Sequence, residues 1–189
     1  MTCARCQQPA VVQAIESHGT VGYCQTCACA RAREVGHERR VRPGAKREAS
    51  ARWLNVEGHR LGLLGELAFA RRYHLAVDLR ARVNDSGVDF ATAAGTVDVK
   101  TNSSPKHPNI LVPADAKIRA DIYVLACVWR KTGVQLMGWC RRSLVEAAPI
   151  KQLVVPTRVV AAPQLNAIEA LDALLLPPGE PVRADEITW

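Results

Sequence analysis

Two strand-like runs of this chain contain acidic residues where apolar ones are expected. Residues 87–90 and 96–101 are rich in β-branched and aromatic residues, which is typical of strands, yet they contain Asp89 and Asp98. Because side chains alternate between the two faces of a strand, Asp98 and Lys100 are expected to share one face. Carboxylates are costly to hold at such positions, so the pattern favours a metal site over ordinary packing.

These residues, with Glu66 before them, resemble the active-site pattern of the PD-(D/E)XK nuclease superfamily. That family carries an acidic residue on a first helix, an Asp at a strand end and an acid-x-Lys triplet on the next strand. Glu66, Asp89, Asp98 and Lys100 follow in the same order, with Val88 where proline is usual. A D-x-K triplet alone also occurs on solvated strand faces, and Glu66 alone would be an ordinary helix residue. The combination favours the nuclease interpretation.

The resemblance covers roughly residues 50–140 and implies a fold. The expected class is α+β (α/β), with a restriction-endonuclease-like mixed sheet of four or more strands. Helices flank this sheet, and the helix with Glu66 lies against one face.

The resemblance also implies a reaction, which is hydrolysis of DNA phosphodiesters with Mg²⁺ or Mn²⁺. Asp89, Asp98 and the Val99 carbonyl would hold the ion, and Lys100 would orient or deprotonate the attacking water. Glu66 would steady a metal-bound water or a second ion. A Holliday-junction resolvase, a restriction-like endonuclease and an end-processing exonuclease are all consistent with the pattern, and a resolvase would need a homodimer.

Cysteines gather near the N-terminus, where residues 3–29 hold five of the seven. Four of them form two C-x-x-C pairs separated by seventeen residues, the spacing of a zinc ribbon: Cys3, Cys6, Cys24 and Cys27. Two such pairs complete the tetrahedral shell of one structural Zn²⁺. Cys29 is a spare thiol or an alternative ligand, as His18 could be. The other interpretation is a set of reactive or incidental thiols.

A basic stretch follows the cysteines. Residues 31–52 hold eight Arg or Lys and three acidic residues, a net charge of +5 within a chain of net charge +7. Pro43-Gly44 breaks any continuous helix, so residues 31–49 are predicted to be a linker. Its basic side chains would hold DNA phosphates, unless the stretch is only a solvated hinge. The candidate DNA contacts are Arg39, Arg40, Arg42, Lys46 and Arg47.

Composition indicates a globular protein, because 48% of the 189 residues are hydrophobic and 23% are charged. No apolar run is long enough for a membrane span, and residues 1–6 do not resemble a signal peptide. The expected setting is cytoplasmic, with reduced cysteines.

The predicted organisation has four parts. A zinc-ribbon-like module (1–30) and the basic linker (31–49) precede the nuclease-like domain (50–176), and a tail (177–189) ends the chain. Helical spacing is expected over 50–73, 141–147 and 163–175. Strands are expected over 75–80, 110–112, 121–129, 134–139 and 154–160, with the third and fourth of these paired.

A rival interpretation is a non-catalytic zinc-ribbon protein that binds nucleic acid or acts as an adaptor on a nuclease-like scaffold. It accounts for the cysteines and the basic stretch. It gives no purpose to the acidic residues and to Lys100 on the strands.

Overall fold

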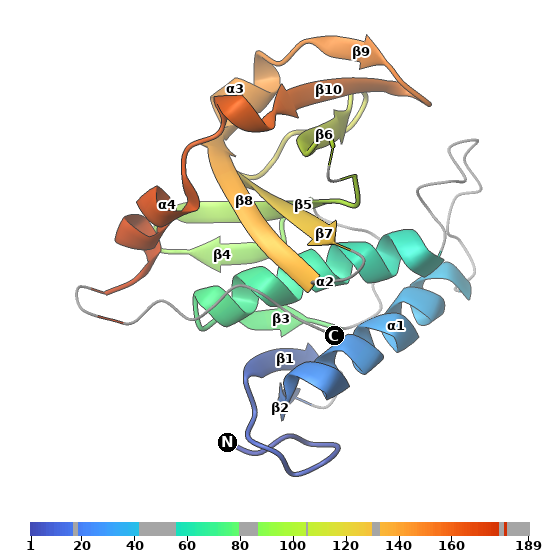
Figure 1. Ribbon diagram of the computed structural model, residues 1–189, viewed down its shortest axis with the longest axis vertical. Coiled ribbons are helices and arrows are strands. Elements are labelled where there is room, and N and C mark those ends of the chain that lie inside the picture. The colour runs from blue at the N-terminus through green and yellow to red at the C-terminus, as the bar shows by residue number, and fades with distance from the viewer. Residues whose placement is uncertain are drawn as a thin grey trace.

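The computed structural model describes residues 1–16, 19–41, 56–79, 87–104, 106–129, 133–177 and 180, which form an α+β fold with three sheets and four α-helices (Figure 1). The strands are β1 (Val12–Glu16), β2 (Gly19–Tyr23), β3 (Ala76–Asp78), β4 (Phe90–Thr92), β5 (Gly95–Asn102), β6 (Asn109–Pro113), β7 (Ile122–Trp129), β8 (Gly133–Arg141), β9 (Ile150–Gln152) and β10 (Pro156–Ala161). The helices are α1 (Gln25–Val41), α2 (Val56–Arg72), α3 (Arg142–Glu146) and α4 (Ile168–Leu175).

The central sheet has the strand order β4-β5-β7-β8. Strands β7 and β8 form the predicted antiparallel pair, β5 runs parallel to β7, and β4 pairs antiparallel with β5. Every residue of β7 except Trp129 is buried, as expected for a strand covered on both faces. A mixed four-stranded sheet is therefore present where the sequence predicts one.

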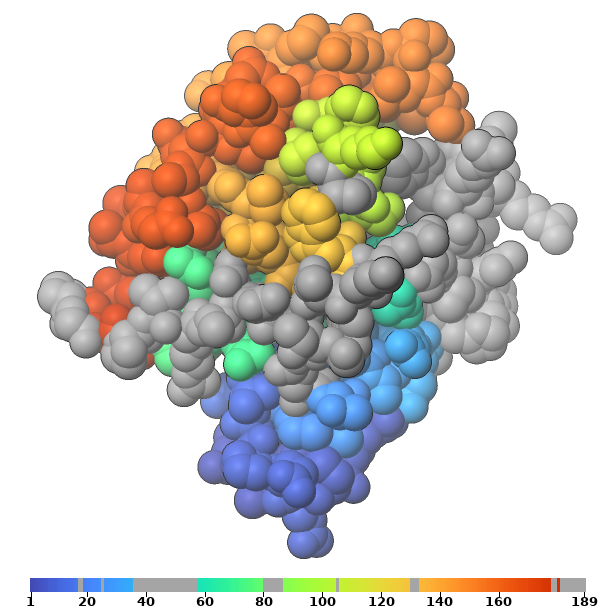
Figure 2. All heavy atoms as spheres, in the orientation of Figure 1, coloured from blue at the N-terminus to red at the C-terminus, as the bar shows by residue number. Residues whose placement is uncertain are grey.

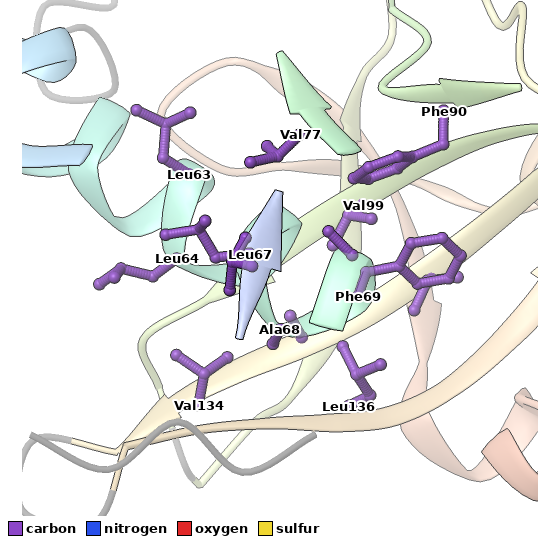
Figure 3. Close-up of a cluster of buried hydrophobic side chains, with 14 of the residues drawn as sticks. Leu63, Leu64, Leu67, Ala68, Phe69, Val77, Phe90, Val99, Val134 and Leu136 are labelled. Carbon is purple, nitrogen blue, oxygen red and sulfur yellow. The ribbon is translucent and has the colours of Figure 1, made fainter. Parts of the chain in front are cut away.

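Two hydrophobic cores cover the two faces of this sheet. On one face, α2 packs its leucines and Phe69 against Val99 of β5 and the apolar side chains of β8 (Figure 3). On the other face lies the antiparallel sheet β6-β10-β9, together with α3. Successive residues of β7 from Ile122 to Ala126 consequently alternate between the two cores, whereas β5 contributes Val97 and Val99 to the first core only.

The N-terminal segment is built into the first of these cores. Strand β1 pairs with β2 and also runs parallel to β3, and α1 packs along α2. Buried residues of the segment, such as Ala14 and Val35, join the core formed by α2. The division of the chain into a module (1–30), a linker (31–49) and a nuclease-like domain (50–176) stays a prediction, but in the structure residues 1–30 share a sheet and a core with residues 56–79.

The stretch predicted to be a linker is helical in its first part. Residues 31–41 continue helix α1, because apolar positions such as Ala32 and Val35 pack inward at helical spacing. Pro43-Gly44, where a helix break is predicted, lies outside the described residues. The remainder of the basic stretch, residues 42–52, is outside the described residues, as are residues 80–86 and most of the predicted tail.

Glycine has a packing role at one point in α2. A Cβ atom on Gly65 would collide with Oγ1 of Thr101 and lie 3.0 Å from the Cβ of Ala126, so the helix backbone rests directly on β5 and β7. A Cβ atom on Gly62 would meet nothing within 4 Å. Gly65 therefore sets the approach of α2 to the sheet, next to Glu66.

This contact predicts opposite results for two Gly→Ala changes. Gly65→Ala is expected to lower the free energy of unfolding by about 1–3 kcal/mol, because the methyl group forces the helix off the sheet. Gly62→Ala is the matched control and should raise it by about 0.5–1 kcal/mol through helix propensity. Urea denaturation measures both, and an equal effect of the two changes would contradict the close contact at Gly65.

A buried ion pair joins α2 to α4. Arg72 donates two hydrogen bonds to Asp172, from Nε at 2.8 Å and from the terminal nitrogen at 2.7 Å, and their side chains are only 8% and 12% exposed. Arg72→Ala should cost about 3–5 kcal/mol in thermal unfolding, because it leaves a carboxylate buried without its partner. The double variant Arg72→Met/Asp172→Leu should recover most of this loss. If the double variant is instead much less stable than the Arg72→Ala protein, loss of the ion pair does not explain the cost.

No helix in the described ranges combines the length and the apolar character needed to cross a membrane.

Candidate functional site

Asp89 lies at the edge of β5 that β4 leaves uncovered. Strand β4 pairs with β5 only as far as Phe90 opposite Val97. Asp89, the residue before β4, continues the contact: its backbone N–H donates to the Val97 carbonyl at 2.8 Å, and its Oδ2 accepts from the Val99 N–H at 2.7 Å. A carboxylate thus occupies the place of the next strand residue at the sheet edge.

Asp98 and Lys100 lie on one face of β5, as alternation predicts. Asp98 is 4% exposed, and its Oδ2 is 2.7 Å from Nζ of Lys100, whose side chain is one-third exposed. Both residues pair across the sheet with Tyr123 and Leu125 of β7, on the side of the second core. Burial and the Asp98 charge raise the pKa of Tyr123. Asp98 is therefore a buried carboxylate with one ammonium close by.

Glu66 reaches the site from the other face. It follows Gly65, which rests on the side of β5 that carries Val99 and Thr101. Burial, then the charges of Glu66 and Asp98, raise the pKa of Asp89 well above its usual range, while the Val99 N–H and Lys100 oppose this shift. Asp89 is therefore close enough to both Glu66 and Asp98 for their charges to act on it, and Lys100 offsets part of this effect.

This donor set suits a hard divalent cation in its chemistry, because Mg²⁺ prefers carboxylate and carbonyl oxygens and relieves repulsion among carboxylates. The Val99 carbonyl and N–H lie on the same side of β5, the side of Asp89, since both groups of one residue point the same way from a strand. The three carboxylates nevertheless do not form one close ligand group among the described residues. Asp98 is turned to Lys100 and Asp89 to the Val99 N–H.

A second cluster, of four thiols, is formed by the two C-x-x-C pairs. The four Sγ atoms of Cys3, Cys6, Cys24 and Cys27 all lie within 4.8 Å of one another, with Cys6–Cys24 at 3.4 Å and Cys6–Cys27 at 3.6 Å. Thiolates bound to one zinc ion at about 2.3 Å in a tetrahedron stand about 3.8 Å apart. The cluster therefore suggests a zinc site, with ligands from the N-terminal turn and from the start of α1.

Backbone N–H groups support a thiolate in this cluster. The Arg5 N–H donates to Sγ of Cys3 at 3.5 Å. Burial raises the pKa of the Cys3 thiol, but hydrogen bonds from the backbone of Cys24, Arg5 and Cys6 outweigh burial and bring this pKa down to about 6. Thiolate is the form of cysteine that binds metal.

The sequence offered two alternative zinc ligands, Cys29 and His18, and the structure describes only the first of them. Cys29 is not among the clustered thiols and packs half-buried against the first core, where burial raises its pKa. His18 is outside the described residues. The pairing of the two C-x-x-C motifs is the arrangement that the structure brings together.

An ion-pair network lies beside the cysteines, and no pattern in the sequence predicts it. Buried Glu16 of β1 accepts hydrogen bonds from Arg31 Nε at 2.8 Å and from the Tyr23 hydroxyl at 3.0 Å. Glu34 accepts from Arg5 at 2.6 Å and from Arg31 at 3.3 Å. Arg31, counted with the basic stretch, therefore pairs with carboxylates within the N-terminal segment. Only the spatial neighbours reveal this role.

The predicted DNA contacts of the basic stretch fall largely beyond the structure. Arg39 and Arg40 lie in the last turns of α1, but their side chains are not described, and Arg42, Lys46 and Arg47 are outside the described residues. Their role stays a prediction.

Comparison with family models, curated proteins and solved structures found no match to this chain. The structure shows an α+β fold with a four-cysteine cluster and does not assign the chain to a family.

Proposed function

We propose that this protein is a metal-dependent nuclease that hydrolyses DNA phosphodiester bonds at the β5 edge. The observation that carries the proposal is that Asp89 is held on the Val99 N–H within range of the charges of Glu66, Asp98 and Lys100, with Asp98 paired to Lys100. Like charges around a buried carboxylate cost stability, so this arrangement is more readily explained by a bound cation than by packing. The net charge of +7 suits a polyanionic substrate.

Each residue has a distinct role in this proposal. Asp89, Asp98 and the Val99 carbonyl would hold Mg²⁺ or Mn²⁺, which when bound supplies Lewis-acid stabilisation of phosphate charge. The Val99 N–H positions the Asp89 carboxylate. The Lys100 side chain, one-third exposed, orients the attacking water or, as the neutral amine, accepts its proton, and in the ammonium form it offsets charge that develops on the phosphate. Glu66 steadies a water from the opposite face of the sheet.

The test is a cleavage assay on plasmid, linear, single-stranded and branched DNA with Mg²⁺, with Mn²⁺ and with a chelator. The proposal expects cleavage of at least one substrate that requires the ion. A clean preparation that binds DNA but cleaves none of the four would favour the non-catalytic zinc-ribbon protein, for which the four-cysteine cluster is the supporting observation. Solution mass tests the homodimer that a junction resolvase would need.

We also propose that Arg39, Arg40, Arg42, Lys46 and Arg47 hold the DNA backbone. Replacing Arg39, Arg40 and Arg42 with Ala should weaken binding across all sequences. Each lost phosphate contact should flatten the slope of log affinity against log salt by about 0.9 for duplex DNA. A salt titration with Ca²⁺ in place of Mg²⁺ measures this change, and unchanged slopes would leave the stretch as a hinge.

A further inference from the structure

The β9–β10 hairpin concentrates exposed apolar side chains. Of the five large apolar side chains exposed in the ranges that the structure describes, three lie in this hairpin: Ile150 at 57%, Leu153 at 46% and Val154 at 56%. The hairpin projects from the top of the molecule (orange in Figures 1 and 2). Clustered apolar exposure at one place marks a binding surface more often than scattered single residues do.

The fold does not require apolar residues at the tip of this hairpin. Residues 153–155 form the bend between β9 and β10, where Gly, Asn, Asp and Ser are the usual residues. Strand β9 is an edge strand of three residues, all exposed, whereas Val159 and Val160 of β10 are buried. Leu153 and Val154 therefore add apolar surface to the tip without serving the core.

The charged residues around the hairpin indicate which kind of partner would bind there. Residues 147–168 contain no acidic side chain, and Lys151 in β9 is exposed. The neighbouring loop, residues 114–120, adds exposed Lys117 and Arg119 against exposed Asp115. An apolar tip with basic surroundings suits a polyanion that also offers apolar surface, which describes the stacked bases and phosphates of nucleic acid.

The same loop connects the hairpin to the proposed site. The Ala114 N–H donates to the Pro156 carbonyl at 2.8 Å, and Arg158 donates to the Ala114 carbonyl at 2.6 Å. Farther along the loop, the Lys117 carbonyl oxygen lies 4.0 Å from where a Cβ atom on Gly87 would stand. Gly87 is two residues before Asp89, so hairpin, loop and acidic edge are neighbours in one continuous part of the molecule.

We propose that the β9–β10 hairpin is a wedge that inserts Leu153 and Val154 between bases of the nucleic acid bound at the Asp89 edge. Lys151 contacts the phosphate backbone beside the insertion. The wedge rests on the proposed function for the placement of the substrate. Separating stacked bases costs a few kcal/mol, and burial of the aliphatic side chains offsets this cost. Because less stacking is lost at mismatched or branched positions, the wedge favours distorted DNA over straight duplex.

The test is binding to duplexes that carry 2-aminopurine, whose fluorescence rises when it is unstacked, with Ca²⁺ in place of Mg²⁺. Wild-type protein should raise the fluorescence and bind a mismatched duplex more tightly than a matched one. Leu153→Ser/Val154→Ser should remove the rise and weaken binding about tenfold or more. Leu174→Ser on α4, which is equally exposed at 44%, is the matched control and should change neither. Lys151→Gln should flatten the salt slope by about 0.9.

The outcomes separate this inference from the proposed function. Unchanged fluorescence and affinity in the Leu153→Ser/Val154→Ser protein overturn the wedge, even if the protein cleaves DNA. A wild-type dimer that becomes a monomer in this variant, with DNA binding unaltered, also overturns it and makes the hairpin a contact between two copies. If the hairpin unstacks bases but the protein cleaves no substrate, the wedge proposal is supported and the proposed nuclease function is contradicted. If the wild-type protein binds no nucleic acid, both the wedge proposal and the proposed nuclease function are contradicted.

Discussion

Asp98→Asn is expected to abolish DNA cleavage, with a loss of at least about 10³-fold in single-turnover rate, while the fold is retained. The change keeps the shape of a side chain that is 4% exposed but removes the carboxylate charge proposed to hold the cation. Lys100→Ala should cause a similar loss. Glu66→Gln should lose less, about tenfold, because its proposed contact is through water.

The matched control for these variants is Glu169→Gln, an exposed carboxylate on α4 that should leave cleavage unchanged. Stability provides a second readout. Asp89→Asn keeps an acceptor for the Val99 N–H and removes one of three repelling charges, so without metal its thermal midpoint should equal or exceed that of the wild type. Full cleavage by the Asp98→Asn protein, prepared identically, would place the activity elsewhere or in a contaminant.

Cys24→Ser is expected to have the largest effect on stability. One equivalent of zinc should co-purify with the wild type and be lost from this variant, because three thiolates no longer close the tetrahedron. The free energy of unfolding should fall by about 5 kcal/mol or more, since the free energy of metal binding contributes to folding. The loss should extend beyond the N-terminal segment, because β1 pairs with β3 and α1 packs on α2.

Cys29→Ser is the matched control, since this thiol lies near the cluster but outside it. It should retain a full equivalent of zinc and cost about 1 kcal/mol from a small polar substitution in a half-buried position. Metal analysis and thermal unfolding measure both variants. A full equivalent of zinc in the Cys24→Ser protein, or none in the wild type, would contradict the assignment of the four ligands.

Local features of the fold could be predicted from the sequence because they depend on short-range periodicity. The apolar run that forms β7, the turn after it and the run that forms β8 predict a hairpin, and the structure contains it. The period of two residues likewise places Asp98 and Lys100 on one face of β5, and the 2.7 Å contact confirms their proximity. The spacing of the two C-x-x-C pairs predicts a four-thiol cluster, and the Sγ atoms are gathered within 4.8 Å.

The N-terminal segment shows contacts that short-range patterns do not specify. Helix α1 continues through the stretch predicted to be a linker, because Ala32 and Val35 are weak apolar signals among many charges and become decisive only when α2 lies beside them. The parallel pairing of β1 with β3 joins residues more than sixty positions apart. Neither pattern nor spacing specifies such a partner.

The sequence by itself thus determined which residues are candidates for a nuclease-like site and a zinc site, because residue types and their spacing follow directly from it. Their catalytic and ligand roles stay predictions. Only the tertiary structure decided that Asp89 closes the open edge of β5 through the Val99 N–H, and that Glu66 approaches from the opposite face over Gly65. It also decided that Arg31 is engaged by Glu16 and Glu34. The physical reason is that these contacts depend on which elements pack against one another in the two hydrophobic cores. That packing depends on the whole chain and is not specified by any local segment.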